Sequence, residues 1–393
     1  MTSLKPATEA ELVDMVQDAL AQRTPLDVTG TGTKKGIGRP MQTAATLDLS
    51  GFSEIALYEP EELVITAGAG ARLDDVRKLL DDKGQEFAFE PPDLSRLLGA
   101  PHSGTLGGML ACNLCGPRRL KAGAARDHIL GVAGVSGRGE AFKAGGRVVK
   151  NVTGYDLPKL MASSYGTLAA LTTVTFKALP KAESEETLVL EGLSDEDAVA
   201  AMSLAMQSSC EVSGAAHLPS ALADGTAKTF LRLEGVPPSI AYRRDKLAKL
   251  LTASGSHLLA TDASRAQWVA LRDVHPLAAP DGRCVWRLSV APMEGAKLVA
   301  ALKPHIDMRW FYDWAGGLVW LAVPPENGAS ADAIRAALPS GHATLIRADE
   351  SLRGQVPVFQ PQAPALAALA RRVKASFDPV GIFNPGRMQQ ESA

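Results

Sequence analysis

Glycine-rich loops in the first half of the chain constrain its fold more than any other feature. Three of them stand beside apolar, periodic segments: Gly30–Lys34 (Gly-Thr-Gly-Thr-Lys), Ser103–Gly108 (Ser-Gly-Thr-Leu-Gly-Gly) and Tyr165–Leu168 (Tyr-Gly-Thr-Leu). Glycine has no side chain to keep the backbone away from a ligand, and it readily adopts positive φ angles. Loops of this kind therefore predict a binding site made largely of main-chain atoms in the N-terminal half.

Phosphate groups are the ligand chemistry that such loops suit. Successive backbone N–H groups in Gly30–Lys34, which follows a predicted strand, form a concave nest for phosphate oxygens. Ser103–Gly108 leads into a predicted helix, and the start of a helix suits a pyrophosphate. The Gly-Lys-Ser/Thr ending of a P-loop is missing from the first loop. The loops thus predict a phosphate-bearing ligand, with ordinary tight turns as the alternative.

The order of periodic segments predicts an α+β fold, because helices and strands alternate along the first 85 residues. Expected helices cover residues 8–23, 73–83, 107–113, part of 154–164, and 364–376. Expected strands cover residues 25–29, 46–49, 55–58, 63–67, 129–136 and 167–179. An aromatic strand pair is expected around Trp310 and Trp320, and Thr8 with Glu11 has the spacing of a helix capping box.

A chain of 393 residues is long enough for two domains. The segment 180–186 is charged and polar, and we place a domain boundary there. We therefore predict a ligand-binding domain at residues 1–180 and a smaller α+β domain at residues 181–362. Residues 363–393 are expected to form a C-terminal helix and tail that pack back on the first domain.

Charge and composition argue against several classes of protein. The formal net charge is −2, which gives no reason to expect binding to nucleic acid or to an anionic membrane surface. No apolar run reaches the roughly 18 residues of a membrane span, and Met1–Glu11 lacks the apolar stretch of a signal peptide. Four cysteines in so long a chain do not indicate a disulfide framework. We expect a cytoplasmic protein, with docking on a membrane-bound partner left open.

The glycine-rich loops occur in an order that resembles the FAD-binding domain of the vanillyl-alcohol oxidase and p-cresol methylhydroxylase (PCMH) type. The matching segments are 30–34, 63–76 (LVITAGAGARLDDV), 90–92 (EPP), 103–113 (SGTLGGMLACN), 150–161 (KNVTGYDLPKLM) and 166–177 (GTLAALTTVTFK). Residues 377–388 (FDPVGIFNPGRM) resemble the closing segment of the D-2-hydroxyacid dehydrogenase branch. Shorter segments are similar to the FAD-binding subunits of bacterial glycolate oxidases, at 116–119, 125–127, 149–156, 286–289 and 341–344. The resemblance covers nearly the whole chain.

This resemblance implies a PCMH-type domain of two α+β subdomains that holds an extended FAD, with a smaller cap domain over the flavin ring. By position, Gly30–Lys34 and Gly104–Gly108 match the pyrophosphate contacts of the family. Gly154, Gly166–Leu168 and Val174 match its adenine and ribose side. The cofactor-binding residues that the resemblance implies are Thr29, Gly30, Thr31, Gly32, Thr33, Lys34, Pro91, Ser103, Gly104, Thr105, Leu106, Gly107, Gly108, Asn113, Ala125, Arg126, Asp127, Gly154, Gly166, Thr167, Leu168, Val174 and Asn384.

Parts of this family attach the flavin covalently through His or Cys, and we expect non-covalent FAD in this chain. The first loop contains no His, and His102 beside the second loop is interpreted as a polar loop residue. Cys112 and Cys115 lie on a predicted helix near that loop. We interpret them as buried structural side chains, because no second cysteine pair accompanies them as an iron–sulfur site would require.

Oxidation of a 2-hydroxy acid by a flavin needs a cation for the carboxylate and a base for the hydroxyl proton. Arg287 and Arg347 are the candidates for the carboxylate, and Trp310, Asp313 and Trp314 are candidates for a pocket under the cap. Catalytic relatives contain a His-Gly-Asp-Gly-x-x-His segment that this sequence lacks. The sequence therefore predicts no metal site, and the missing segment argues against independent oxidation by this chain.

Three functional hypotheses follow. In the first, the chain is the FAD-binding subunit of a glycolate oxidase complex that oxidises glycolate to glyoxylate. A catalytic flavoprotein subunit and an iron–sulfur subunit would pass the electrons to quinone, and these partners would attach the complex peripherally to the inner membrane. In the second, the chain is a self-sufficient FAD-dependent dehydrogenase for a small D-2-hydroxy acid, glycolate or D-lactate. In the third, it is a flavin-free assembly scaffold, against which the intact glycine loops argue.

Overall fold

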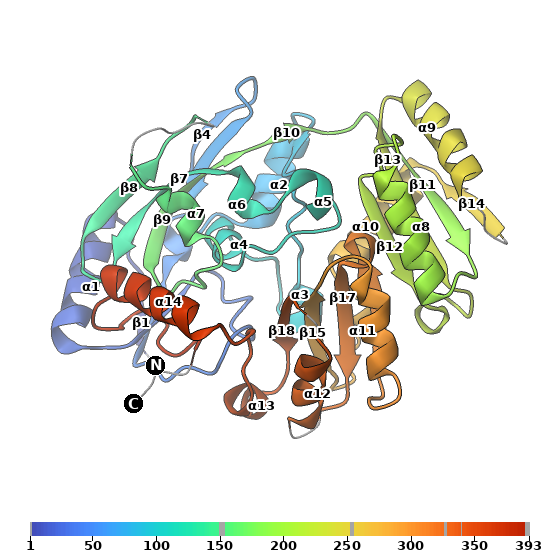
Figure 1. Ribbon diagram of the computed structural model, residues 1–393. Helices are drawn as coiled ribbons and strands as arrows, with labels where there is room; N and C mark the ends of the chain where they lie inside the picture. Colours follow the sequence, from blue (N-terminus) through green and yellow to red (C-terminus); the bar gives the residue numbers. More distant parts are fainter. Residues whose placement is uncertain (1, 149–153, 252–254, 326–327, 339, 390–393) are drawn as a thin grey trace.

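The computed structural model describes residues 2–148, 154–251, 255–325, 328–338 and 340–389. Figure 1 shows the N-terminal elements on one side of the molecule and the elements from β11 onward on the other, with α14 crossing back to the N-terminal side. Helices and strands alternate throughout, so the predicted α+β class is confirmed. In the described part of the chain, no helix combines the length and the apolar character that crossing a bilayer requires.

The first element group is a small parallel sheet with one helix. Its strands are ordered β1-β3-β2, with β1 at Thr2–Leu4, β2 at Leu26–Thr29 and β3 at Ala45–Asp48. Helix α1 (Glu9–Gln22) begins after Thr8, whose side chain accepts a hydrogen bond from the backbone N–H of Glu11 at 3.2 Å. The Glu11 carboxylate accepts from Ala7 N rather than from Thr8 N, so only half of the expected capping box forms. Helix α1 buries its apolar stripe against both N-terminal sheets.

A five-stranded antiparallel sheet forms the rest of the N-terminal half. Its order is β4-β5-β9-β7-β8, with β4 at Ile55–Glu59, β5 at Val64–Gly68, β7 at Ile129–Ser136, β8 at Ala141–Gly145 and β9 at Ala169–Lys177. The helices of this half are α2 (Leu73–Asp81), α3 (Ser95–Leu98), α4 (Leu106–Cys112), α5 (Arg119–Ala122), α6 (Ala125–His128) and α7 (Leu157–Met161). Two short strands, β6 (Gln85–Glu86) and β10 (Leu179–Pro180), pair where the chain leaves this half.

An eight-stranded antiparallel sheet organises the second half of the chain, in the order β14-β11-β13-β12-β16-β17-β15-β18. The strands are β11 (Ser184–Glu191), β12 (Gly214–Leu218), β13 (Lys228–Gly235), β14 (Gly255–Leu259), β15 (Cys284–Ser289), β16 (Arg309–Asp313), β17 (Leu318–Val323) and β18 (His342–Arg347). The helices are α8 (Asp195–Gln207), α9 (Pro237–Leu250), α10 (Thr261–Arg272), α11 (Glu294–Leu302), α12 (Ala329–Ala337) and α13 (Glu350–Gln355). The expected aromatic strand pair is β16 with β17.

Strand alternation gives this large sheet two different buried faces. Trp286 and Leu288 of β15 belong to a core shared with α8, α11 and α12. Val285 of the same strand belongs to the core that contains most of the N-terminal half, together with Phe311 and Trp320. One face of the sheet therefore packs on its own helices, and the other faces the glycine-rich loops; we call the second one the inner face.

Residues 180–186, where the sequence predicts a domain boundary, lead from strand β10 into strand β11. Strand β11 already begins at Ser184. Glu185 is only 4% exposed, and its carboxylate accepts a hydrogen bond from Ser264 at 2.6 Å. The charged composition of this segment therefore includes a buried carboxylate of a strand. The domain limits predicted from the sequence stay a prediction.

The C-terminal segment returns to the first strands of the chain. Helix α14 (Pro364–Phe377) lies on the surface beside the N-terminal elements, as Figure 1 shows. After it, Leu26 N donates to Ile382 O at 2.7 Å and Asn384 N donates to Leu26 O at 3.0 Å, which adds the tail to strand β2. Residues at the two ends of the chain thus build one piece of structure.

Candidate active site

A cleft in the N-terminal half encloses about 730 Å³ of space, part of which is open solvent. The first loop forms one wall, and the second and third loops form the others. The predicted residues that line the cleft are Thr29, Gly30, Thr31, Gly32, Thr33, Lys34, Thr105, Gly107, Gly108 and Gly166. The structure therefore brings the three glycine-rich loops together around one space, although they are far apart in the sequence.

The first two loops touch so closely that side chains would not fit between them. A Cβ atom at Gly30 would lie 2.7 Å from Thr105 Oγ1, and one at Gly104 would lie 2.3 Å from Lys34 Nζ. Both distances are shorter than any ordinary van der Waals contact. A side chain at position 30 would collide with the short Thr105 side chain, whereas one at position 104 would displace the flexible end of Lys34.

The main chain of the first loop is free to bind a ligand. In the described part of the chain, no protein acceptor takes a hydrogen bond from the backbone N–H groups of Thr31, Gly32, Thr33 or Lys34. Because these residues line the cleft, their N–H groups are available to donate to a bound anion. The Thr31 Oγ1 and Ser103 Oγ atoms are also buried without a partner. This donor set fits an anion such as a phosphate.

The second loop differs from the expectation that its helix start binds a pyrophosphate. Leu106 N donates to Ala71 O at 3.0 Å, Gly107 N to Ala69 O at 2.7 Å, and Gly108 N to Thr105 Oγ1 at 3.2 Å. These three N–H groups of the first turn of α4 are therefore already hydrogen-bonded within the protein. Gly107 and Gly108 still line the cleft, where their lack of a side chain leaves room for a ligand.

Positive charge gathers at the cleft. Among the described residues that line it, the ionised side chains at neutral pH are those of Lys34, Lys35 and Arg387, and none is a carboxylate. Lys35 pairs with Asp27 at 2.6 Å, and Arg387 donates to Lys34 O at 2.9 Å. Lys34 has no ion-pair partner in the described part of the chain, and burial lowers its pKa. The cleft thus offers an uncompensated ammonium group to an anionic ligand, and its chemistry fits the diphosphate of FAD.

Asn384 and the third loop support the cleft from behind. Asn384 Oδ1 accepts from Val28 N at 2.7 Å, and its Nδ2 donates to Tyr165 O at 2.8 Å. This one buried amide joins strand β2, the third loop and the C-terminal tail. Three more predicted residues are buried in the scaffold next to the cleft without lining it, namely Thr167, Leu168 and Val174.

Other predicted cofactor residues do not line this cleft. Ser103, Gly104 and Leu106 belong to the second loop but stand outside the lining. Pro91 precedes this loop, and its carbonyl accepts a hydrogen bond from Arg77. Asn113 ends α4 and accepts from Arg126 N at 2.9 Å. Ala125, Asp127 and Gly154 are likewise absent from the lining. Their cofactor contacts stay a prediction.

Sequence reasoning missed the apolar and small residues of the cleft wall. They are Val28, Leu49, Ala69, Ala111, Ser164, Ala169 and Leu171, with Cys112 and Tyr165 beside them. Each belongs to a strand, a helix or a turn whose apolar pattern reads as ordinary core. Strand β2 belongs to the small parallel sheet, whereas β5 and β9 pair in the five-stranded sheet. Only the packing of the two sheets places these residues around one space, so no local signal marks them.

The two candidate arginines have different surroundings. Arg347 Nε donates to Arg283 O at 3.1 Å, its Nη1 donates to Ala279 O at 3.1 Å, and its Nη2 lies 3.5 Å from Asp281 Oδ1. Arg287 has no hydrogen bond or ion pair in the described part of the chain, and its Nε is buried without a partner. Its guanidinium lies over the Trp314 ring, 4.8 Å from the ring centre. Arg287 is therefore the better placed of the two to bind a carboxylate.

Asp313 and Trp314 stand on the same inner face as Arg287. Asp313 is 2% exposed and accepts from Trp314 N at 2.7 Å. Trp314 Nε1 donates to Gly116 O at 3.0 Å, which ties this turn to the N-terminal half. Trp314 and Ala315 both have left-handed φ angles, 52° and 53°, which are costly for residues with side chains. The turn thus keeps a strained backbone where the two halves meet.

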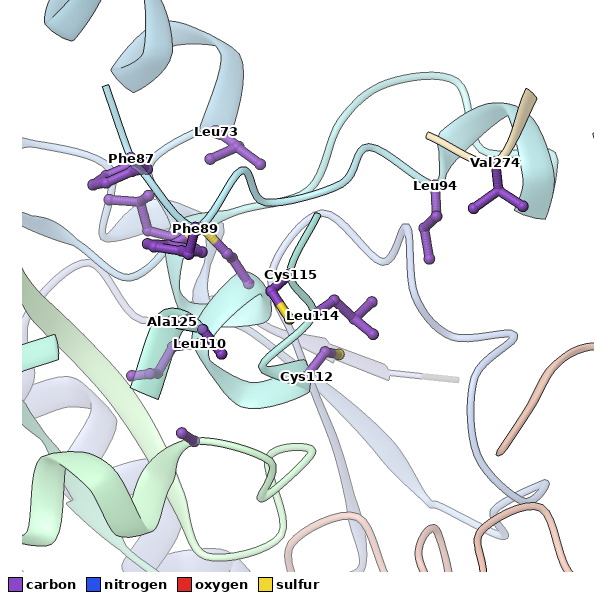
Figure 2. Packing of buried hydrophobic residues seen from close by; sticks show 14 of the residues in the cluster. Leu73, Phe87, Phe89, Leu94, Leu110, Cys112, Leu114, Cys115, Ala125 and Val274 are labelled. Atoms are coloured by element: carbon purple, nitrogen blue, oxygen red, sulfur yellow. The ribbon is translucent and has the colours of Figure 1, made fainter. Parts of the chain in front are cut away.

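Cys112 and Cys115 are both buried and free, as Figure 2 shows for the apolar cluster around them. Helix α4 ends at Cys112, so Cys115 stands in the following loop rather than on the helix. Burial raises the pKa of the Cys115 thiol to about 11 and also raises that of Cys112. In the described part of the chain, no group of three or more His, Cys, Asp or Glu side chains is arranged to bind a metal ion.

The chain is similar in sequence to FAD-binding proteins. The family model described as "FAD binding domain" matches residues 3–145. The chain is 33% identical to glycolate oxidase subunit GlcE of Escherichia coli (strain K12) over 97% of each protein. It is 25% identical to glycolate oxidase subunit GlcD of Bacillus subtilis (strain 168), covering 99% of this chain and 89% of that one.

Solved structures share the fold. The chain superposes on p-cresol methylhydroxylase with a TM-score of 0.74 at 14% identity, covering 98% of this chain and 88% of that one. The 4-ethylphenol oxidase from Gulosibacter chungangensis gives a TM-score of 0.74 at 13% identity, covering 99% and 89%. These structures confirm the predicted PCMH-type fold.

Proposed function

Because the chain belongs to the family of FAD-linked oxidoreductases that contains glycolate oxidase subunit GlcE, we propose that it is the FAD-binding subunit of a glycolate oxidase complex. The observation that supports this most is similarity along the whole length of both chains, at 33% identity. The reaction proposed is oxidation of glycolate to glyoxylate. The predicted cytoplasmic location, and attachment to the inner membrane through partner subunits, belong to the same proposal.

The first loop and Lys34 would bind the diphosphate of FAD. Unpaired N–H groups from Thr31 to Lys34 supply hydrogen bonds, and the Lys34 ammonium supplies charge. When bound, the flavin would supply a two-electron redox group to the complex. The apolar wall of the cleft excludes water from the cofactor.

Non-covalent binding is part of the proposal. The described residues that line the cleft include no histidine, and their only thiol is that of Cys112. Burial raises the pKa of that thiol, so it stays neutral, and a neutral thiol is a poor nucleophile. We expect denaturation to release the FAD.

The partner subunits are proposed from two relatives. One relative is named GlcE and the other GlcD, which are names for two subunits of a glycolate oxidase. We propose that a GlcD-type flavoprotein oxidises the substrate and that an iron–sulfur subunit passes electrons towards quinone. The missing His-rich segment is what assigns the chemistry to the partner.

A second candidate is a self-sufficient dehydrogenase for glycolate or D-lactate. The specific observation in its favour is Arg287, whose guanidinium stays unpaired on the inner face. A guanidinium stacked on an aromatic ring is well suited to bind a carboxylate. In this reading, the chain would oxidise substrate without a partner.

Anaerobic addition of glycolate separates these candidates. The chain purified alone should show an oxidised-flavin spectrum that glycolate leaves unchanged, and the flavin should bleach once the partner subunits are added. Bleaching of the chain alone would contradict the subunit proposal and establish the self-sufficient enzyme. A colourless protein without extractable FAD would contradict both and leave the scaffold hypothesis. Glycolamide, which has no carboxylate, is the matched control.

A further inference from the structure

We propose that Arg387, carried by the C-terminal tail (residues 378–389), is an anion-binding residue of the cleft, and that its buried charge links docking of the tail to binding of a diphosphate. This inference rests on the proposed function, because the diphosphate would be that of FAD. It deepens that function by naming a residue outside the glycine-rich loops that couples cofactor binding to the position of the tail.

Arg387 reaches the cleft because the tail is docked on the N-terminal half. It lines the cleft and is only 7% exposed. Asn384 N donates to Leu26 O at 3.0 Å, and Arg39 N donates to Arg387 O at 2.9 Å. A Cβ atom at Gly38 would lie 2.8 Å from Arg387 Cγ, so the chain after the first loop packs directly against this side chain. The guanidinium is therefore buried at the cleft only while the tail is docked.

The hydrogen bonds of Arg387 leave one side of its guanidinium free. Its Nε donates to Ile37 O at 3.3 Å, and its Nη2 donates to Lys34 O at 2.9 Å. Nη1 has no acceptor among the described residues. An arginine carries five N–H donors in a rigid fork that matches phosphate oxygens. Arg387 thus holds the end of the first loop and keeps donors for an anion.

No carboxylate neutralises this charge in the described part of the chain, because the acceptors of Arg387 are backbone carbonyls. The guanidinium of Arg353 lies close by, where it donates to Gly38 O at 2.8 Å. Burial lowers the pKa of Arg353, and the charge of Arg387 adds to this effect, although Glu350 opposes it. Like charges therefore meet where the tail docks, and a buried charge without a counterion is costly.

The cleft itself adds to this cost. Lys34 also lines it, and within the described residues its ammonium group pairs with no carboxylate. A diphosphate carries a negative charge on each phosphate, so its binding offsets the positive charge of Lys34 and Arg387 together. Docking of the tail should therefore be weaker in the empty chain than in the loaded one. Such a linkage acts equally in both directions, because binding of the anion and docking of the tail share one coupling free energy.

A purely structural role for Arg387 makes a different prediction. If the side chain were only an anchor, its loss would release the tail whether or not an anion is bound. If its charge is the link, its loss should make docking of the tail independent of the anion. The response to the anion, rather than the stability of the tail, separates the two roles.

Hydrogen exchange measured by mass spectrometry reports docking of the tail without relying on turnover. The full chain is stripped of flavin and compared in pyrophosphate and in potassium chloride of equal ionic strength. Peptides that cover residues 382–389 should exchange about tenfold more slowly in pyrophosphate, a usual size for coupled sites. Peptides from β15 of the large sheet should not change. Loading with FAD should slow the same tail peptides.

Variants assign the effect to the charge. Arg387→Met should show the same tail exchange with and without pyrophosphate, and it should bind pyrophosphate about tenfold more weakly. Arg387→Lys keeps a positive charge and should retain most of the response. Arg372→Met is the matched control, because Arg372 is an exposed arginine of α14. It should behave like the unmodified chain.

Three results would overturn the inference. Equal tail exchange of the unmodified chain in pyrophosphate and in potassium chloride would show that no linkage exists, and this comparison needs no variant. Equal slowing of β15 would indicate stabilisation of the whole chain instead. A response that persists in Arg387→Met would assign the link to another cation.

The flavin content of the purified chain tests the proposed function separately. A colourless chain whose tail responds to pyrophosphate would contradict the FAD proposal and leave the linkage standing. A flavin-loaded chain whose tail ignores both pyrophosphate and FAD would contradict the linkage alone.

Discussion

Lys34 is the residue that best illustrates how the cleft would recognise FAD. Its ammonium group points at Gly104, and within the described residues it pairs with no carboxylate. Lys34→Met should weaken FAD binding by about 2 kcal/mol, or roughly thirtyfold, because a charge-assisted contact is lost while the side chain keeps its length. Fluorescence quenching of FAD by the apoprotein measures the dissociation constant.

Lys78→Met is the matched control, since Lys78 is exposed on α2. It should bind FAD as the unmodified chain does. Burial lowers the pKa of Lys34, so affinity for FAD should also decline as pH rises through that lowered pKa, and Lys34→Met should lack this decline. If Lys34→Met bound FAD as tightly as the unmodified chain, the Lys34 ammonium group would have no role in FAD binding.

At the residue scale, the sequence predicted which loop supplies hydrogen-bond donors, but it did not predict which contacts each side chain makes. The loop Gly30–Lys34 could be predicted because glycine and threonine in a loop after a strand are typical of a phosphate-binding turn. The sequence could not predict that Arg287 and Arg347 have different hydrogen-bond partners, because each is a single arginine in a strand. Only the tertiary contacts show that Arg347 is tied to backbone carbonyls while Arg287 is not.

At the scale of elements, the segment before the second loop joins the two halves through buried charges. Glu90 accepts from Arg232 Nη1 at 2.7 Å and Nη2 at 3.0 Å, and from Arg118 N at 2.7 Å. Arg118 in turn donates to Glu234 of β13, at 3.0 Å from Nε, and to Glu86. This network fixes the large sheet against the N-terminal half.

Glu90→Gln should destabilise the protein by about 3 kcal/mol, because the buried Arg232 loses its hydrogen-bonded carboxylate and keeps only Glu234, 3.6 Å away. Urea unfolding measures the change. Glu211→Gln, which removes an exposed partner of Arg243, should cost less than about 1 kcal/mol. The double variant Glu90→Gln/Arg232→Met should recover part of the loss. Similar costs for the buried and exposed pairs would contradict this role.

The same pair predicts acid sensitivity. Burial alone would raise the pKa of Glu90, but Arg232 and Arg118 lower it to about 2. The folded-state pKa is thus below the ordinary value of 4.5, so the stabilisation is present above pH 4.5 and is lost as pH falls toward 2. Urea unfolding at several acid pH values should show a shallower pH dependence for Glu90→Gln. An unchanged dependence would assign the acid sensitivity elsewhere.

Elements with a strong periodic pattern were predictable, and short ones were not. The expected helix at residues 8–23 is α1, and the strand at 129–136 is β7. Strand β8 was missed because Ala141–Gly145 has too few residues for a pattern, and it forms by pairing with β7. The role of Glu90 was missed because its partners are distant in the sequence, with Arg118 28 and Arg232 142 positions later.

At the scale of the whole molecule, the two ends of the chain meet behind the cleft. Asn384 is 1% exposed and joins β2 to the third loop through its amide. The packing of the C-terminal tail against the N-terminal half could be predicted only from the family resemblance. The sequence of residues 377–388 contains no local signal that they pair with β2. The inner face of the large sheet was equally unpredictable, since it depends on how two halves dock.

Asn384→Ala should lower stability by about 2 kcal/mol, because Val28 N and Tyr165 O lose buried hydrogen bonds. The same variant should bind FAD more weakly, because the third loop loses its support. Urea unfolding and FAD titration measure the two effects. Asn384→Asp keeps the acceptor for Val28 N and should fall between the two proteins. Full stability of Asn384→Ala would show that the tail is not needed behind the cleft.

The most direct test of the central claim is the flavin content of the purified chain. The account predicts an oxidised-flavin spectrum with about one FAD per chain, released into the supernatant when the protein is denatured. Gly30→Val should purify folded but nearly colourless, since a side chain at this position meets Thr105. A colourless unmodified chain, or flavin that stays with the denatured protein, would contradict the account.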